Sequence, residues 1–224
     1  MIAVPTKFEC DCAGIMEDGM YVPDSLTWNE IMGEDIKMKA IKPGIGNSAE
    51  MNTIVTCNFS LFTVQEKSPG DIVYEKVETA ISHRYQIGQA DCVPGLEMCL
   101  RHSKVGSLLK VRATSRFAFG TSGRPAIPTL GILQIPSNAS IEYVVLIVEH
   151  KSIGTLAVDR DSSMDLEEAR VRKEAGNRWF TYREYMKAGR CYSQGAKKSQ
   201  KVLNETQMVF YIGLIYILRT YMRL

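Results

Sequence analysis

The sequence lacks an excess of charge of either sign, and it lacks a long apolar run. Its 27 Lys and Arg residues nearly balance 25 Asp and Glu residues, which leaves a net charge of +2 over 224 residues. Dedicated nucleic-acid-binding proteins usually carry a clear basic excess, so no nucleic-acid partner is expected. With 45% hydrophobic and 23% charged residues, the chain has the composition of a folded domain with a buried core. This composition excludes a disordered chain, a collagen and a multi-span membrane protein.

Signals for export and for metal binding are also missing. The N-terminus has no basic stretch followed by an apolar one, so we expect no signal peptide. The six cysteines are too scattered for a disulfide-stapled scaffold, and we expect reduced, mostly buried thiols in a cytoplasmic protein. Cys10 and Cys12 form a lone C-x-C, but a metal site needs about four ligands, and no C-x-x-C or H-x-x-x-H accompanies it. We therefore expect neither a metal nor another cofactor.

Residues 35–150 are dominated by apolar–polar alternation of period two. Met51–Phe62 and Ser107–Phe117 both alternate in this way, which predicts half-buried antiparallel strands. Ile141–Val148 is apolar at nearly every position, as expected of a central strand covered on both faces. Val93–His102 is predicted as a short amphipathic helix, because its Pro94 is tolerated in a first turn. One short helix against a curved antiparallel sheet is an α+β half-barrel.

The composition changes after His150. Residues 153–165 form a polar connection with Ser and Asp suited to cap a helix, and Leu166–Lys198 then has helical spacing with a break near Tyr182–Arg183. The apolar stripe of this segment comprises Ala175, Trp179, Tyr185, Ala188 and Tyr192. Residues 151–201 hold twelve basic and seven acidic residues, a net charge of +5. Acidic residues interrupt the basic ones, which indicates a solvated helix face rather than the continuous stripe that phosphate contacts need.

Several short runs, taken together, resemble the FKBP immunophilins, a family of peptidyl-prolyl isomerases. The family pattern reads F-x-L-G-x-x-x-V-I-x-G-W-E, then V-G, then Y-A-Y-G, then I-P-P-x-A-x-L. The matching runs are Tyr85–Gly88, Asp91–Glu97, Val105–Gly106, Arg116–Gly120 and Ile135–Ile141, preceded by Ile36–Gly46 as the first strand and turn. Their order and spacing agree over about 115 residues. The resemblance implies an FKBP-like domain over residues 35–150, after an N-terminal extension over residues 1–34.

The C-terminal part resembles the first tetratricopeptide repeat of the larger FKBPs. Lys173, Gly176, Asn177 and Phe180 match one helix of the repeat, and the pattern Tyr185-x-x-Ala188-x-x-x-Tyr192 matches the other. The resemblance implies helices over Glu168–Thr181 and Glu184–Lys197, in an incomplete unit over residues 166–207 that follows a linker over residues 151–165. In repeats of this kind a lysine and an asparagine hold the acidic C-terminal tails of heat-shock chaperones, which implies this role for Lys173 and Asn177. A purely structural repeat is the alternative.

One repeat does not bury its own apolar face, because about three are needed for a stable array. The apolar tail over residues 208–224 either packs on the exposed repeat face or reflects a truncated gene product. Some relatives are anchored by such tails to mitochondria or the endoplasmic reticulum. The run of eleven apolar residues in Met208–Leu218 is short for this purpose, so a membrane anchor is not expected.

The resemblance also implies a pocket for X-Pro peptides. Its lining would comprise Phe59, Tyr74, Glu75, Tyr85, Cys92, Val93, Leu96, Phe119, Ile127 and Tyr143. Rotation about an X-Pro amide requires neither a nucleophile nor a metal. An apolar pocket that removes water from the amide, with hydrogen bonds that favour its twisted state, lowers a barrier of about 18–20 kcal/mol.

Several pocket positions depart from the pattern of the active family. Leu96 stands where the family has a tryptophan floor, and Phe119 stands where a tyrosine donates its hydroxyl to the substrate. Phe59 also replaces a tyrosine, and Glu75 replaces an aspartate. Loss of one aimed donor can cost about 10²-fold in rate. Two hypotheses follow: a peptidyl-prolyl cis-trans isomerase of low activity that serves as a chaperone partner or scaffold, or a non-catalytic interaction module.

Overall fold

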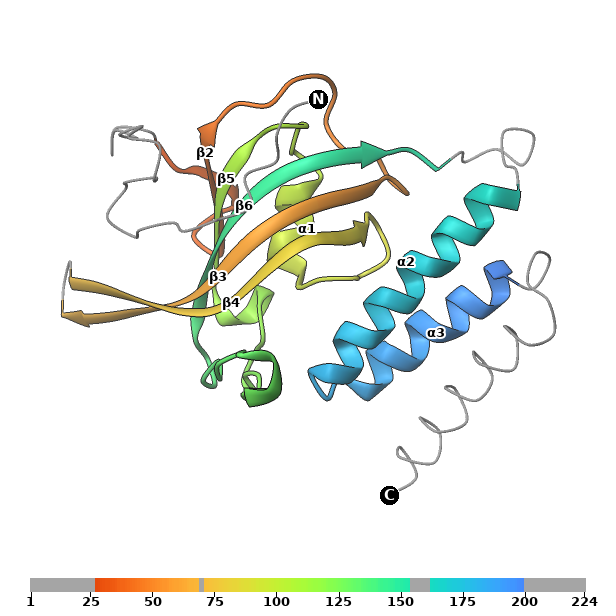
Figure 1. Ribbon diagram of the computed structural model, residues 1–224. Coiled ribbons are helices and arrows are strands. Elements are labelled where there is room, and N and C mark those ends of the chain that lie inside the picture. Colours follow the sequence, from red (N-terminus) through yellow and green to blue (C-terminus); the bar gives the residue numbers. More distant parts are fainter. Residues whose placement is uncertain (1–26, 69–70, 154–161, 200–224) are drawn as a thin grey trace. The chain divides into compact units, whose positions relative to one another are not determined.

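The computed structural model describes residues 27–68, 71–153 and 162–199. Six strands form one sheet in the order β1-β2-β5-β6-β3-β4 (Figure 1). The strands are β1 (Asn29–Met32), β2 (Ile36–Lys42), β3 (Ile54–Ser68), β4 (Asp71–Gln86), β5 (Leu108–Ala113) and β6 (Ser140–Lys151). The helices are α1 (Pro94–Leu100), α2 (Ser162–Thr181) and α3 (Tyr185–Ser199), with short 3₁₀ turns at Ser115–Phe117 and Pro128–Leu130. This antiparallel sheet with one helix, followed by two further helices, confirms the predicted α+β class.

Strand β6 lies in the interior of the sheet, and its pairing with β5 fixes which side chains share a face. Val111 stands opposite Tyr143, and Leu109 stands opposite Val145. Because side chains alternate along a strand, these residues occupy one face, and Val144 occupies the other. Both faces of β6 are buried over most of its length, as its apolar composition predicts.

The prediction of a half-buried strand over Met51–Phe62 is wrong. Strand β3 is buried on both faces in its first half, and its polar residues Asn58 and Ser60 are as buried as the apolar ones. Each finds a polar partner on β4: the Asn58 side-chain oxygen accepts a hydrogen bond from the Ser82 N–H, and Ser60 pairs with the Thr79 hydroxyl. β3 lies between β6 and β4, where small polar side chains can be buried once they are hydrogen-bonded.

The chain divides into two compact units. The sheet unit comprises Met1–Ser48, Cys57–His83 and Val93–Glu149; the helical unit comprises Ala49–Thr56, Arg84–Cys92 and His150–Leu224. The helical unit therefore holds α2 and α3 together with the start of β3, the end of β4 and the segment that follows β4. Strands β3 and β4 each pass from one unit into the other.

The helical hairpin is close to the predicted one, apart from its start. The break near Tyr182–Arg183 is confirmed: α2 ends at Thr181, and Arg183 adopts a left-handed conformation with φ of 62°. Helix α2 begins at Ser162, however, before the predicted Glu168. The reason lies in packing, because Met164 already packs against a buried cluster of Ile54, Ile153 and Val171. The apolar residues of the tail, Met208–Leu218, lie outside the described residues. Within the described residues no helix is long and apolar enough to cross a membrane.

Candidate functional site

One face of the sheet is packed against α1. The helix begins after Val93, with Pro94 in its first turn, where the missing N–H costs nothing. Gly95 brings the helix close to β5, since a Cβ atom placed there would lie 2.6 Å from the Ala113 Cβ. Leu96, on the next position of the helix, is fully buried, and Val93 is almost so. Of the predicted pocket residues, these two belong to the packed core of the sheet unit.

Two predicted pocket residues meet directly. The rings of Phe59 on β3 and Tyr143 on β6 pack edge to face, with centroids 5.4 Å apart and planes at 75°. The ring of His83 on β4 meets Phe59 in the same way, at 5.3 Å. Edge-to-face pairs of this kind fix ring orientation as well as burying area. Three strands thus contribute to one aromatic cluster.

Phe119 lies in the segment that follows β5, and its partner is a charged residue. The Arg124 guanidinium stands 5.2 Å from the centroid of the Phe119 ring, and it forms a buried ion pair with Glu78 on β4. Arg124 also exchanges backbone hydrogen bonds with Ile135, at 2.9 Å each. These bonds hold the loop that carries the half-buried Ile127.

The buried pair of Arg124 and Glu78 is not predicted from the sequence. The available signal was the position of Glu78, an acidic residue next to the apolar Val77 and two positions before the apolar Ala80 in β4. An acidic side chain is rarely fully buried unless it is paired, so a buried strand position for Glu78 would have called for a basic partner. Arg124 supplies that partner and also lies against the Phe119 ring. A charge neutralised by Glu78 therefore lies next to one predicted pocket residue.

Tyr74 and Glu75 lie elsewhere. Tyr74 packs with Phe62, Leu108 and Val144, which is the opposite face of the sheet from Tyr143. Its hydroxyl accepts a hydrogen bond from Arg112 Nη2 at 2.6 Å, and burial raises its pKa. Glu75 is exposed. The structure therefore does not bring either residue to the aromatic cluster of Phe59 and Tyr143, and the buried acidic residue of this strand is Glu78.

The remaining predicted pocket residues, Tyr85 and Cys92, belong to the helical unit. Both are buried. The Arg178 guanidinium of α2 stands 4.8 Å from the centroid of the Tyr85 ring, and Arg178 Nη2 donates to the Arg84 carbonyl at 2.9 Å. Tyr85 is thus fixed by a helix that follows it by more than seventy residues in the chain.

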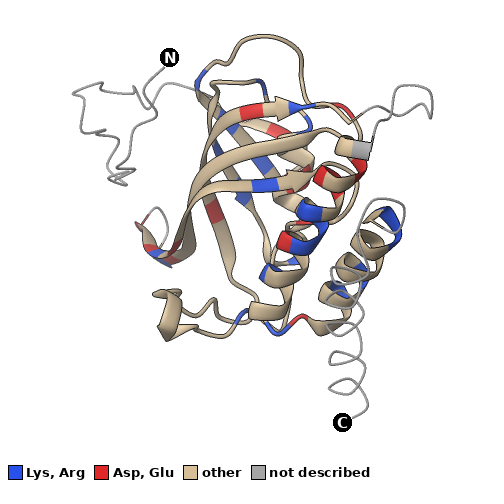
Figure 2. Ribbon diagram, turned by 45° about the vertical axis from the view of Figure 1, so that its right-hand side comes forward, with Lys and Arg blue, Asp and Glu red and all other residues tan. Residues whose placement is uncertain are grey.

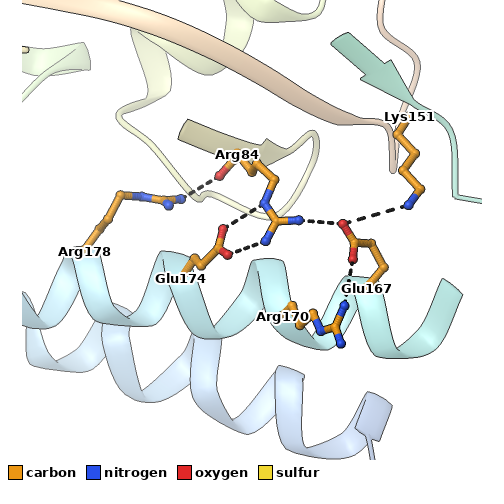
Figure 3. Close-up of polar contacts among 6 residues, drawn as sticks. All are labelled: Arg84, Lys151, Glu167, Arg170, Glu174 and Arg178. Carbon is orange, nitrogen blue, oxygen red and sulfur yellow. Dashed lines mark hydrogen bonds and ion pairs between the residues drawn. The ribbon is translucent and has the colours of Figure 1, made fainter. Parts of the chain in front are cut away.

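A second strand residue is held by the same helix (Figure 3). Arg84 Nε donates to a Glu174 oxygen at 3.0 Å, a second Arg84 nitrogen pairs with the other Glu174 oxygen, and Nη1 pairs with Glu167 at 2.5 Å. Glu167 also lies 3.9 Å from Lys151 and 3.8 Å from Arg170. A two-bond contact between guanidinium and carboxylate is directional, and it fixes the register between the strand end and α2.

A buried ion pair lies nearby in the helical unit. Arg172 of α2 donates to Asp91, and both side chains are about 1% exposed. The same Asp91 oxygen accepts a hydrogen bond from the Gln86 N–H at 2.8 Å. Burial raises the pKa of Asp91, and the charge of Arg172 opposes that rise. Arg172 lies on the same face of α2 as the buried Ala169, Ala175 and Trp179. A charged residue at an otherwise apolar position of a helix was the sequence signal for a buried partner.

The two residues implied for binding acidic tails lie one turn apart on α2. Lys173 is half-buried and Asn177 is exposed. The Tyr192 hydroxyl of α3 donates to the Asn177 side-chain oxygen at 2.8 Å, and burial raises the pKa of Tyr192 to about 12. A Cβ atom on Gly176 would lie 2.5 Å from the Tyr192 ring. Glycine is therefore needed for the two helices to approach at this point. In Figure 2 basic residues mark both helices, while the acidic residues lie on α2.

Thiol and metal chemistry find no support among the described residues. Cys57, Cys92, Cys99 and Cys191 are buried thiols. Burial raises the pKa of Cys99 to about 12 and that of Cys191 to about 11, so both stay protonated at neutral pH and are poor nucleophiles. Over the described ranges no group of three His, Cys, Asp or Glu side chains could hold a metal ion. Cys10 and Cys12 lie outside these ranges.

Comparison with known families finds a match over part of the chain. Residues 46–148 match the model of the family described as FKBP-type peptidyl-prolyl cis-trans isomerase. The crystal structure of a multi-domain immunophilin from Arabidopsis thaliana is similar at 17% identity and a TM-score of 0.50, over 88% of this chain and 76% of that one. At this identity the likeness concerns the fold.

Two further structures show weaker similarity. The N-terminal domain of FKBP42 from Arabidopsis thaliana has 16% identity and a TM-score of 0.44, over 66% of this chain and 98% of that one. The three FKBP domains of wheat FKBP73 have 20% identity and a TM-score of 0.46, over 59% of this chain and 52% of that one. Comparison with curated proteins finds no match.

Proposed function

Since residues 46–148 of this chain match the model of the FKBP-type peptidyl-prolyl cis-trans isomerase family, we propose that the protein binds prolyl segments of other proteins and isomerises them weakly. In this proposal it serves as a chaperone partner or scaffold in the cytoplasm. The ligand is an extended X-Pro peptide, and the reaction is rotation about the amide that precedes the proline. No cofactor takes part.

The side chains predicted to line the pocket are mostly apolar, as the binding of a proline ring requires. Phe59, Tyr143, Leu96 and Val93 are all buried in the sheet unit, and the Tyr143 hydroxyl is the one polar side-chain group in this set. A twisted amide carries less charge separation than a planar one, so an environment that removes water favours rotation. By this argument the apolar side chains alone give some catalysis, without an aimed donor.

The observation that carries the expectation of weak activity is the surroundings of Phe119. Its ring is half-buried, has no hydroxyl, and stands against the compensated guanidinium of Arg124. A ring without a donor cannot supply the hydrogen bond that would favour the twisted amide. Leu96 adds to this effect because it is smaller than tryptophan and is fully buried in the core.

The test is prolyl exchange on a short Leu-Pro peptide, measured for wild type and for Phe119→Tyr. The restored hydroxyl should raise the rate about 10²-fold, the value of one aimed donor. Phe117→Tyr is the matched control, because Phe117 is another half-buried ring of the same segment, stacked with Arg116. The control should leave the rate unchanged.

A second variant combines Phe119→Tyr with Leu96→Trp. Because Leu96 has no exposed surface, tryptophan overpacks the core at a cost of about 1–3 kcal/mol, so its unfolding free energy must be measured alongside. A wild-type rate as high as that of Phe119→Tyr would mean that the donor is not needed. Absence of peptide binding by every variant would overturn the proposal.

A non-catalytic alternative rests on the helical unit, where Lys173 and Asn177 lie one turn apart. Asn177 accepts the Tyr192 bond through its carbonyl oxygen, so its amino group is the end that a carboxylate would use. We infer binding of acidic C-terminal tails, such as those of heat-shock chaperones. The test is binding of a peptide ending in consecutive acidic residues: Lys173→Ala should weaken it about tenfold, the scale of one charge-assisted bond. The exposed Lys197→Ala, which removes the same charge, should not.

A further inference from the structure

Basic side chains gather on the face of the sheet that turns away from α1. We call this group the cationic face, and it comprises Lys37, Lys39 and Lys42 of β2 with Lys110 and Arg112 of β5. Helix α1 approaches β5 at Ala113. Arg112, the preceding residue, lies on the opposite face because side chains alternate along a strand.

The register of β2 and β5 brings these charges side by side. Lys37 stands opposite Arg112, and Lys39 stands opposite Lys110. Residues that stand opposite one another share a face, and like charges in such pairs destabilise the sheet. Lys42 extends the row at the end of β2 and is exposed. A negatively charged segment placed over the cationic face would therefore be stabilising.

Carboxylates within the sheet unit offset part of this charge. The Glu142 side chain of β6 is 3% exposed and pairs with both basic residues of β5, at 2.8 and 3.6 Å. Glu34 pairs with Lys37 at 2.5 Å, and Glu30 stands opposite the same lysine. The five basic residues against these three acidic ones give a net charge of +2. Three of the basic side chains are 24%, 25% and 28% exposed, so a segment that covers the sheet can reach them.

The described part of the chain begins at this face. Trp28, the second described residue, lies over Arg112, with the guanidinium 4.8 Å from the centroid of its ring. The same guanidinium stands 5.9 Å from the centroid of the Tyr74 ring and donates to the Tyr74 hydroxyl at 2.6 Å. Arg112 therefore anchors the chain at the point where residues 1–26 join the sheet unit.

The chain that precedes Trp28 has the opposite charge. Residues 1–26, which we call the acidic extension, contain one basic residue and five acidic ones, a net side-chain charge of −4. The acidic residues are Glu9, Asp11, Glu17, Asp18 and Asp24. Charges of opposite sign are screened least where they are partly buried, as several are on the cationic face.

The acidic extension is also long enough to cover the cationic face. Strand β2 has seven residues, and the seven residues 21–27 span about 23 Å when extended, the length of such a strand. A segment joined to its docking surface by a short tether has an effective concentration of about 1 mM. An attached acidic segment is therefore favoured over a dilute acidic partner.

We propose that the cationic face is a docking surface for an acidic, extended segment, and that its occupant is the acidic extension of the same chain. This surface lies on the other side of the sheet from Phe59 and Tyr143. The inference is therefore independent of the proposed binding of prolyl peptides.

The first test uses the full 224-residue chain and a carbodiimide, which joins a lysine amine to a carboxylate in contact with it. Links located by mass spectrometry should join carboxylates of the acidic extension to Lys42 or Lys110. Lys104, an exposed lysine between α1 and β5, is the control and should form few such links. Mixing unlabelled and ¹⁵N-labelled chains shows whether each link lies within one chain.

The second test measures the rate of chymotryptic cleavage after Tyr21. Docking should protect this site, so the double variant Glu17→Gln, Asp18→Asn should be cleaved about fivefold faster than wild type, the scale of two partly solvated charge contacts. The matched control is Asp71→Asn, Glu75→Gln, which removes the same two charges at exposed positions of β4. It should be cleaved at the wild-type rate.

Wild-type cleavage of the Glu17→Gln, Asp18→Asn variant would overturn the inference, as would links to Lys104 as frequent as those to the cationic face. Links found only between labelled and unlabelled chains would assign the face to the extension of a second copy. Links to an added poly-glutamate peptide, without links to the acidic extension, would assign the face to an acidic partner. Either of these last results would overturn the choice of occupant.

Discussion

The two units of the molecule are stabilised by different interactions. The sheet unit relies mainly on apolar packing: Leu61, Leu96, Ile141 and Tyr143 are buried, and aromatic rings meet edge to face. It also holds the buried ion pair of Arg124 with Glu78. The helical unit relies on charge: Arg172 pairs with a buried aspartate, and Arg84 pairs with two glutamates. A buried pair loses far more when one partner is removed than it contributes as a pair. Single substitutions of charged residues should therefore damage the helical unit, while the sheet unit should respond to changes in apolar volume and, among its charged residues, to the loss of Arg124 or Glu78.

The two tryptophans allow the unfolding of each unit to be measured separately. Trp28 belongs to the sheet unit and Trp179 to the helical unit, and the sequence contains two tryptophans in all. Fluorescence in a Trp28→Phe background therefore follows the helical unit during unfolding. Fluorescence in a Trp179→Phe background follows the sheet unit.

The largest effect is expected at the buried ion pair. Arg172→Met leaves Asp91 as an uncompensated buried charge, which should lower the free energy of unfolding of the helical unit by about 3–5 kcal/mol. Trp179 fluorescence in urea measures the loss. Arg170→Met on the same helix is the control, because its side chain is 62% exposed and should change stability by less than about 1 kcal/mol.

A double variant separates charge from volume at the same place. Arg172→Met combined with Asp91→Leu removes both charges and fills the site with apolar atoms, which should restore most of the lost stability. If the double variant is as unstable as Arg172→Met alone, packing rather than the stranded charge sets the cost. The contrast between the two units would then disappear.

The sheet unit should lose stability when buried apolar volume is removed. Leu61 on β3 has no exposed surface, so Leu61→Ala leaves a cavity and should cost about 2–5 kcal/mol, read from Trp28. Leu133→Ala is the control, since Leu133 is 45% exposed. An equal response of the Trp179 signal would show that the units unfold as one.

Alkaline pH should act on the helical unit through Cys191. Burial raises the pKa of Cys191 from 9.0 to about 11, so the folded state holds the thiol proton more tightly than the unfolded chain does. Stability should therefore fall as pH rises from about 9 to about 11, by about 2–3 kcal/mol in total.

Cys191→Ala removes this part of the alkaline loss, while the part due to Tyr192 remains, because its pKa is raised to about 12. Cys99→Ala is the control: Cys99 also has a pKa of about 12 but lies in the sheet unit. It should leave the Trp179 signal unchanged. A Cys191→Ala protein as sensitive to alkali as wild type would contradict the assignment.

The prediction of the fold was most accurate where local sequence signals agree with the packing. Pro94 and Gly95 mark the start of α1 at the place where the chain must approach β5. The left-handed Arg183 falls at the predicted break between the helices. The half-buried prediction for β3 was wrong because Asn58 and Ser60 are buried by bonding to β4. Periodicity shows which residues share a face, but not whether a polar face is covered.

The candidate site was less predictable than the fold, because its contacts join segments that are far apart in the sequence. Phe59 and Tyr143, both predicted to line the pocket, lie in contact, whereas Tyr74 packs on the other face of the sheet, against Val144. Asp91 was visible as a motif residue, yet its partner lies 81 positions away on α2. Long-range pairing of this kind depends on the fold and is not encoded by spacing within either segment.

The smallest effect is expected at the ion pairs of Arg84 with Glu167 and Glu174 of α2. Its pairs are partly solvated, with side chains 25% exposed for Arg84 and 42% for Glu174, so Glu174→Gln should lower the stability of the helical unit by about 0.5–1 kcal/mol. Salt at about 1 M should lower the stability of the wild-type helical unit by a similar amount, because the Debye length is then about 3 Å. The same salt should change the stability of the Glu174→Gln variant little. Glu184→Gln, which breaks the Lys187 pair at 3.4 Å within one helix turn, should change stability less. The sheet unit, read from Trp28, should be less sensitive to salt than the helical unit; equal sensitivity of the two would mean that charge does not distinguish them.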